Sequence, residues 1–187
     1  MNRNQLERAL RSAGEIARDR DFYIFGSQAI LGLVTRPPKR CLVSMELDIY
    51  PRNNYQAAPM LVAKLGRRSV FSKRNGYFLD CVSSELATLP EGWTDRLVPF
   101  RTKNTGGVTD WCLEIHDLVI SKLAAGRPKD LEYITALVTR KLATPLIVKV
   151  RIDSIGANTG TKETMRLALK QMLTRIKNAR RKSRVAK

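Results

Sequence analysis

Cysteine and histidine are scarce in this chain, which holds three Cys and one His among 187 residues. Cys41, Cys81 and Cys112 are an odd number and lie far apart, so they match neither a disulfide framework nor a zinc-binding spacing. Free cysteine is among the most buried residue types. We therefore expect three buried thiols in a reducing compartment.

Long apolar runs are also missing. No stretch approaches the ~18 consecutive apolar residues of a membrane helix. The N-terminal segment MNRNQLERALRSAGEIARDRD mixes acids with bases and has no apolar signal core. With 43% apolar and 27% charged residues, the composition is that of a globular chain rather than a collagen-like or disordered one. The sequence predicts a cytoplasmic protein without a membrane partner.

Acidic residues are half as frequent as basic ones, 17 against 34, which gives a net charge of +17. Residues 162–187 hold ten Lys and Arg against one acid, a charge of +9, and the rest of the chain carries +8. This balance favours polyanionic partners or substrates such as nucleic acid, nucleotides or an acidic protein. A basic tail that is simply solvated is the alternative.

Hydrophobic periodicity divides the chain into two parts, residues 1–115 and 116–187. The first part alternates helical and strand patterns, with strands expected at 22–25, 41–50, 97–101 and 108–114, helices at 6–17, 28–34 and 57–65, and a hairpin at Asn75-Gly76 between 69–72 and 77–82. The second part is helical, with segments at 116–125 and 129–141, a helix or strand at 146–152, and a basic terminal helix. The fold class is therefore α+β, a small mixed sheet with packed helices, followed by a C-terminal helical region.

Gly26-Ser27 lies between a short apolar strand and a helical segment. Glycine allows a phosphate to approach the backbone N–H groups, and serine adds a hydroxyl at the helix start, where an anion is favoured. A purely structural turn is the alternative for this pair alone.

Glu46 and Asp48 are spaced two residues apart on an expected strand, so both carboxylates project from one face. Like charges at this range repel unless a cation lies between them, and oxygen ligands of this kind suit Mg²⁺. The alternative is a solvated outer face of the sheet. Asp80 is a third acid in an otherwise apolar strand, where it must be paired, exposed or metal-bound.

The order and spacing of these three features resemble the nucleotidyltransferase superfamily typified by DNA polymerase β. Four motifs are closer still to a small bacterial branch akin to the abortive-infection and toxin–antitoxin nucleotidyltransferases. They are GSQAILG at 26–32, SMELDIYP at 44–51, LPEGW at 89–93, and C-L-E-x-H-D-L-x-x-S-K-L-x-A-G-R-x-K-D-L-E at 112–132. The resemblance covers about residues 1–155.

The resemblance implies a role for each matching residue. Gly26 and Ser27 would hold a nucleoside triphosphate, and Glu46 and Asp48 would bind two Mg²⁺ ions, with Mn²⁺ as the alternative ion. Asp80 would be the third carboxylate, which binds one metal and activates the attacking hydroxyl. One departure is that the first metal residue is Glu rather than the commoner Asp.

The reaction implied is two-metal nucleotidyl transfer, in which the ions clamp the attacking and leaving oxygens of an in-line displacement. The acceptor would be an RNA, such as tRNA, or a protein. The protein would then be a toxin of a toxin–antitoxin or phage-defence pair, with a cognate antitoxin as a further partner. The alternatives are a catalytically degenerate fold that binds nucleic acid, and a partner protein within such an operon.

Lys122 and Arg127 are the cations that we expect to meet the triphosphate or the acceptor, because Arg suits bidentate phosphate contact and Lys serves as a point charge. Solvated helix cations are the alternative, and Asp130 is placed to orient either one. His116 is expected in a cap or a structural contact rather than as a base. Trp93 and Trp111 are expected to pack rather than to stack on a base.

Overall fold

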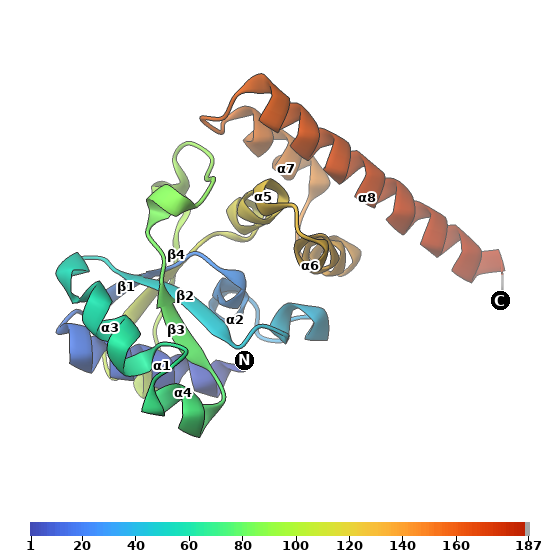
Figure 1. Ribbon diagram of the computed structural model, residues 1–187. Coiled ribbons are helices and arrows are strands. Elements are labelled where there is room, and N and C mark those ends of the chain that lie inside the picture. Colours follow the sequence, from blue (N-terminus) through green and yellow to red (C-terminus); the bar gives the residue numbers. More distant parts are fainter. Residues whose placement is uncertain (186–187) are drawn as a thin grey trace. The chain divides into compact units, whose positions relative to one another are not determined.

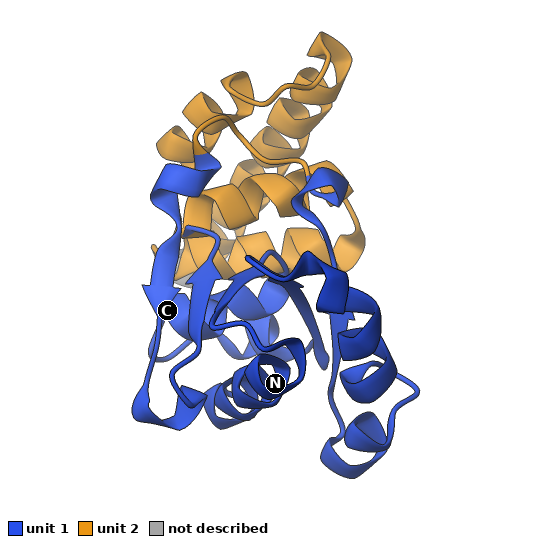
Figure 2. Cartoon of the chain, turned by 90° about the vertical axis from the view of Figure 1, so that its left-hand side faces the viewer, with its two compact units in different colours: residues 1–87, 93–114 blue, residues 88–92, 115–187 orange. Residues whose placement is uncertain are grey.

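The computed structural model describes residues 1–185, in two compact units (Figures 1 and 2). One unit comprises Met1–Ala87 and Trp93–Glu114, and the other comprises Thr88–Gly92 and Ile115–Lys187. No helix of the described part of the chain is long and apolar enough to cross a membrane.

The first unit is built on a five-stranded mixed sheet, which confirms the predicted α+β class. Its strands are β1 (Asp21–Ile24), β2 (Glu46–Pro51), β3 (Phe78–Cys81), β4 (Val98–Phe100) and β5 (Thr109–Cys112). Their order is β3-β2-β1-β5-β4, with β1/β5 and β2/β3 parallel and β1/β2 and β4/β5 antiparallel. The start of β2 therefore lies beside the end of β1.

The helices of the first unit are α1 (Arg3–Ala17), α2 (Ile30–Leu33), α3 (Ala58–Leu65) and α4 (Val70–Asn75). α1 begins with a capping box, in which Asn2 and Gln5 satisfy each other's backbone N–H groups. Its apolar face is buried as the periodicity predicts, with Leu6, Leu10 and Ala13 at 0% exposure.

Two sequence predictions in this unit are wrong. Asn75-Gly76 is not a hairpin turn: it ends α4, and Gly76 takes the left-handed conformation (φ 72°) that closes a helix as well as it opens a hairpin. The strand expected at 41–50 begins only at Glu46. The segment Lys39–Leu42 is a 3₁₀ turn after Pro38, in which the Cys41 N–H donates to the Pro38 carbonyl at 2.8 Å.

The second unit is helical as predicted, with α5 (Ile115–Ala125), α6 (Pro128–Thr139), α7 (Pro145–Asp153) and α8 (Thr159–Val185). Proline stands at the start of α6 and of α7, where its missing N–H costs nothing. The apolar stripe of α8 is buried at Met165, Leu169, Met172 and Ile176, whereas Leu173 is half-buried. This leaves the cations of α8 on its outer faces.

Candidate active site

The Gly26-Ser27 turn follows β1 directly and touches β2. The Phe25 N–H donates to the Asp48 carbonyl at 3.3 Å, and a 3₁₀ turn over Ser27–Ala29 then leads into α2. A Cβ atom placed on Gly26 would lie 1.5 Å from Oδ2 of Asp48. Only glycine therefore fits at position 26 while the Asp48 carboxylate keeps its place.

The two carboxylates of β2 share one face of the strand, as the spacing predicts. Along β2 the half-buried positions Glu46 and Asp48 alternate with the buried Leu47 and Ile49. Asp80, which is exposed, is the direct register partner of Asp48 on the parallel strand β3. The sheet thus places Asp48 between the turn at Gly26 and the third predicted carboxylate.

The carboxylates on this face of β2 are ligands that fit Mg²⁺, which takes one or two carboxylates together with phosphate oxygens and water. Glu46 and Asp48 supply such a pair. No group of three His, Cys, Asp or Glu side chains among the described residues is close enough together to hold a metal ion. Glu46, Asp48 and Asp80 therefore do not form such a group, and Asp80 lies beside the pair as the register partner of Asp48.

Arg67, in the loop between α3 and α4, is a site residue that the sequence analysis missed. Its guanidinium lies 3.9 Å from Oε1 of Glu46 and 4.5 Å from the ring centre of Phe78, the register partner of Glu46. The side chain is 73% exposed. It supplies a positive charge beside a predicted metal ligand, and nothing in its sequence neighbourhood distinguishes it from the other surface arginines.

Gln28 is a second residue that the analysis did not single out, although it lies in the GSQAILG motif. It is fully buried, and its Nε2 donates to the Ser44 carbonyl at 2.7 Å. Its Oε1 has no hydrogen-bond partner among the described residues. The side chain ties the turn after β1 to the segment that leads into β2, and so it fixes the spacing between Ser27 and Glu46.

None of the three cysteines is in a disulfide, as expected. Cys41 and Cys112 are buried, and Cys81 is half-buried next to Asp80. Burial, and then the neighbouring carboxylate of Asp80, raise the pKa of the Cys81 thiol to about 11. A thiol of such high pKa is a poor nucleophile near neutral pH.

Lys122 and Arg127 meet at Asp130 in the second unit. Nζ of Lys122 lies 3.2 Å from Oδ1 of Asp130, and Nε of Arg127 lies 2.6 Å from Oδ2. Lys122 is 6% exposed and stands 4.4 Å from the ring centre of Tyr133, so it is not a solvated helix cation. Hydrogen bonds from the two cations hold the pKa of Asp130 below its usual range against the effect of burial.

His116 and the two tryptophans have structural contacts, as predicted. Nε2 of His116 accepts the Thr144 N–H at 2.9 Å, which joins α5 to the start of α7. Trp93 packs edge-on against Tyr23 and Phe25. Nε1 of Trp111 donates to the Asp21 carboxylate at 2.8 Å.

The mixed sheet with its packed helices is compatible with a nucleotidyltransferase fold. The chain belongs to the family described as nucleotidyltransferase of unknown function (DUF6036), which matches residues 4–181. No curated protein and no solved structure matches the chain.

Proposed function

We propose that the protein is a metal-dependent nucleotidyltransferase that moves a nucleotidyl group from a nucleoside triphosphate to an RNA or protein acceptor. One observation carries the proposal: Asp48 lies against Gly26 of the Gly-Ser turn on one side and in register with Asp80 on the other. The proposed phosphate-binding turn and the carboxylates of β2 and β3 thus lie close together on neighbouring strands of the sheet.

Different residues of the chain would bind the phosphates, hold the metal and position the site. The turn at Gly26 presents backbone N–H groups, and the Ser27 hydroxyl offers a further donor, so this segment binds the phosphates of the triphosphate. Glu46 and Asp48 would hold the Mg²⁺, which supplies charge neutralisation on the phosphates during transfer. Gln28 keeps the turn and the strand at a fixed spacing, which is the positioning that phosphoryl chemistry requires.

Asp80 is the proposed acceptor of the proton that leaves the attacking hydroxyl. Its carboxylate is exposed on the face that Asp48 shares, so an acceptor can reach it. The new bond joins the acceptor oxygen to the α-phosphorus while the bond to the pyrophosphate oxygen breaks. Pyrophosphate leaves with the electron pair, and the hydroxyl proton goes to Asp80.

The family resemblance motivates the biological setting. A toxin of a toxin–antitoxin or phage-defence pair that modifies tRNA or a protein fits a small transferase of high positive charge. A cognate antitoxin would then be its partner.

Label transfer tests the activity. The protein is incubated with Mg²⁺, α-³²P-labelled nucleoside triphosphates and total cellular RNA or protein, and we expect one fraction to become labelled. Asp48→Asn should abolish labelling with little loss of fold, because Asn is nearly isosteric but lacks the charge that Mg²⁺ needs. Glu15→Gln is the matched control, since Glu15 is an exposed carboxylate on α1. Labelling that survives the double change Glu46→Ala and Asp48→Ala would refute the proposal.

A second candidate is a degenerate nucleotidyltransferase fold that only binds nucleic acid. It is favoured by the contact between Arg67 and Glu46 and by the missing three-ligand group among the described residues. The two candidates differ in consumption of substrate, because the enzyme releases pyrophosphate and a binding protein does not. Pyrophosphate release in the presence of total RNA or total protein separates them.

A further inference from the structure

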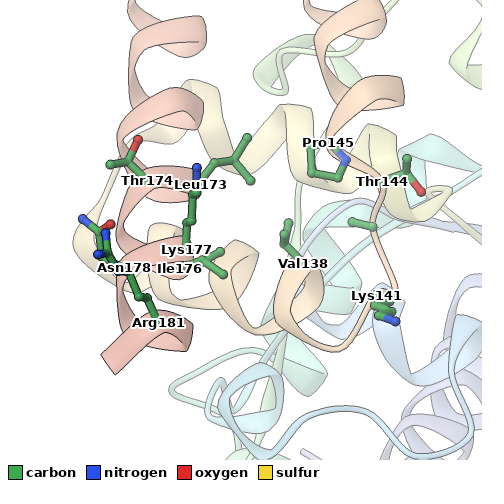
Figure 3. A pocket seen from close by; sticks show the side chains of 11 residues that line it. Val138, Lys141, Thr144, Pro145, Leu173, Thr174, Ile176, Lys177, Asn178 and Arg181 are labelled. Carbon is green, nitrogen blue, oxygen red and sulfur yellow. The ribbon is translucent and has the colours of Figure 1, made fainter. Parts of the chain in front are cut away.

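Two hollows in the second unit join along α8 into one groove. The larger has a volume of about 990 Å³ and lies between the end of α6, the start of α7 and α8 (Figure 3). The other, of about 640 Å³, continues between α7 and α8. Leu173, Thr174 and Lys177 line both hollows, so the two are continuous.

Six cations line this groove. Arg166 pairs with Asp153, and the other five are Lys141, Lys149, Lys170, Lys177 and Arg181. These five are exposed, and none of their side chains has a hydrogen bond or ion pair with another described residue. The one carboxylate that lines the groove is Asp153, at its far end, where Arg166 already pairs with it. The groove therefore carries a positive charge that no side chain among the described residues neutralises.

The cations on α8 form a straight row. Lys170, Lys177 and Arg181 are seven and four residues apart, so at 3.6 residues per turn they point in nearly one direction. The row extends over about 16 Å, at 1.5 Å per residue. A row of this length matches an extended polyanion better than a single phosphate.

Lys141 lines the groove although its backbone conformation disfavours a residue with a side chain. It follows the end of α6 with φ 58°, a left-handed position where helices favour glycine. Any side chain there strains the backbone. A lysine at such a position is understandable if its charge serves a ligand.

The lining also indicates how the ligand is recognised. The floor is aliphatic, at Val138, Leu173 and Ile176, and no aromatic ring lines either hollow. The groove has no rings for base stacking, and its one carboxylate, Asp153, is already paired with Arg166. It therefore offers contacts to the phosphates and sugars of a nucleic acid rather than to its bases. Residues 1–161 also carry a net positive charge, so the protein attracts a polyanion beyond the groove residues of α8 as well.

We propose that this groove binds the phosphate backbone of an RNA strand, without sequence preference. Only one part of this proposal rests on the proposed function, namely that the bound RNA is also the acceptor of the nucleotidyl group. Binding needs neither triphosphate nor Mg²⁺, so it can be tested even if transfer fails.

Fluorescence anisotropy with a labelled oligouridylate of about 16 nucleotides measures the binding. Salt is varied from about 50 to about 200 mM, and the slope of log K against log salt counts the contacts, at about −0.7 for each phosphate neutralised on a single strand. Five contacts give a slope of about −3.5.

Two double variants with the same loss of charge locate the site. Lys177→Gln/Arg181→Gln removes one Lys and one Arg from the groove, and Lys129→Gln/Arg175→Gln removes the same pair from exposed positions outside it. The groove variant should lose about 1.4 from the slope, which is about 25-fold in affinity at 0.1 M salt if the affinities are equal at 1 M. The control variant should bind like the wild type.

Lys141→Gly gives a readout that a merely structural role would not produce. The melting temperature should be maintained or rise, because glycine accepts the backbone conformation, while the salt slope loses about 0.7. Equal effects of the groove and control variants would overturn the proposal in favour of diffuse attraction. Displacement of the RNA by an oligoglutamate of the same length at lower concentration would overturn it in favour of an acidic protein segment.

Discussion

At the scale of single residues, the contact between Gly26 and Asp48 controls the site. A methyl group on residue 26 would overlap the Asp48 carboxylate, since its Cβ would be 1.5 Å from Oδ2. Rotation of the carboxylate would relieve only part of the overlap, since Cβ of Asp48 would still lie 2.8 Å away. The glycine therefore allows both the close approach of the turn to β2 and the position of a predicted metal ligand.

Gly26→Ala should lower the rate of nucleotidyl transfer by about 100-fold, because a displacement of about 1 Å costs that much in positioned chemistry. The melting temperature should fall as well, because Cβ of Asp48 would lie 2.8 Å from the new methyl group and the turn must shift away from β2. Initial rates of label transfer and thermal unfolding measure the two effects. Gly156→Ala is the control, since a Cβ there meets nothing within 4 Å. A wild-type rate for Gly26→Ala would show that the Asp48 carboxylate is not needed where it lies.

At the scale of elements, buried charge joins α5 to α6. Lys122 and Asp130 are 6% and 2% exposed, and Asp130 compensates the buried ammonium group at 3.2 Å. Truncation of one partner of such a pair leaves a buried charge without its counter-ion. The Lys122–Asp130 pair therefore contributes to the packing of α5 against α6 in the second unit.

Asp130→Asn should lower the free energy of unfolding by about 3 kcal/mol at neutral pH. The pKa of Asp130 is lowered in the folded state, so its contribution is present above the ordinary carboxyl pKa and is lost as the pH falls through the folded value. Urea unfolding at neutral and acidic pH tests both statements. A difference between variant and wild type that stays constant in acid would contradict the ion-pair explanation.

The end of α4 is a second test at this scale. Gly76 has φ 72°, and a Cβ there meets nothing within 4 Å. Gly76→Ala should therefore lower the free energy of unfolding by about 1 kcal/mol through backbone strain alone. Chemical denaturation measures the change, and label transfer should be unaffected. No loss of stability would show that α4 does not end in the left-handed conformation.

At the scale of the whole molecule, a buried acid makes stability depend on pH. Asp110 on β5 is 0% exposed, and its Oδ2 accepts from the Cys112 thiol at 3.1 Å. Its Oδ1 has no hydrogen-bond partner in the part of the chain that the structure describes. Burial raises the pKa of Asp110 to about 8. The folded protein thus holds a proton that the unfolded chain releases, and stability falls as the pH rises towards that value.

The wild type should lose about 1.4 kcal/mol of stability per pH unit relative to Asp110→Asn between about pH 4 and pH 8. The neutral amide removes the titrating group, so the difference between the two proteins isolates Asp110 from all other groups. Urea unfolding across this range measures the slope. Parallel stability curves for the two proteins would show that Asp110 is ionised in the folded state.

Much of the fold could be predicted because its signals are local. Each of these signals acts within one element. They are the period of the apolar residues in α1 and α8, the prolines at the starts of α6 and α7, and the alternation of Glu46 and Asp48 with buried residues along β2. One of the two errors arose where one residue pair serves two structures. Asn-Gly suits a hairpin and a helix end equally, and only the packing of α4 decides between them.

The sequence by itself determined the α+β class, the Gly-Ser turn and the spacing that puts two carboxylates on one face. Tertiary structure alone decided which residues from distant segments meet: Asp80 beside Asp48, Arg67 beside Glu46, and Asp130 beside Lys122. It also decided that Asp110 is buried and that the cations of α7 and α8 share one groove. The physical reason is that periodicity records which side of an element is apolar, whereas strand register and helix packing set which polar side chains become neighbours.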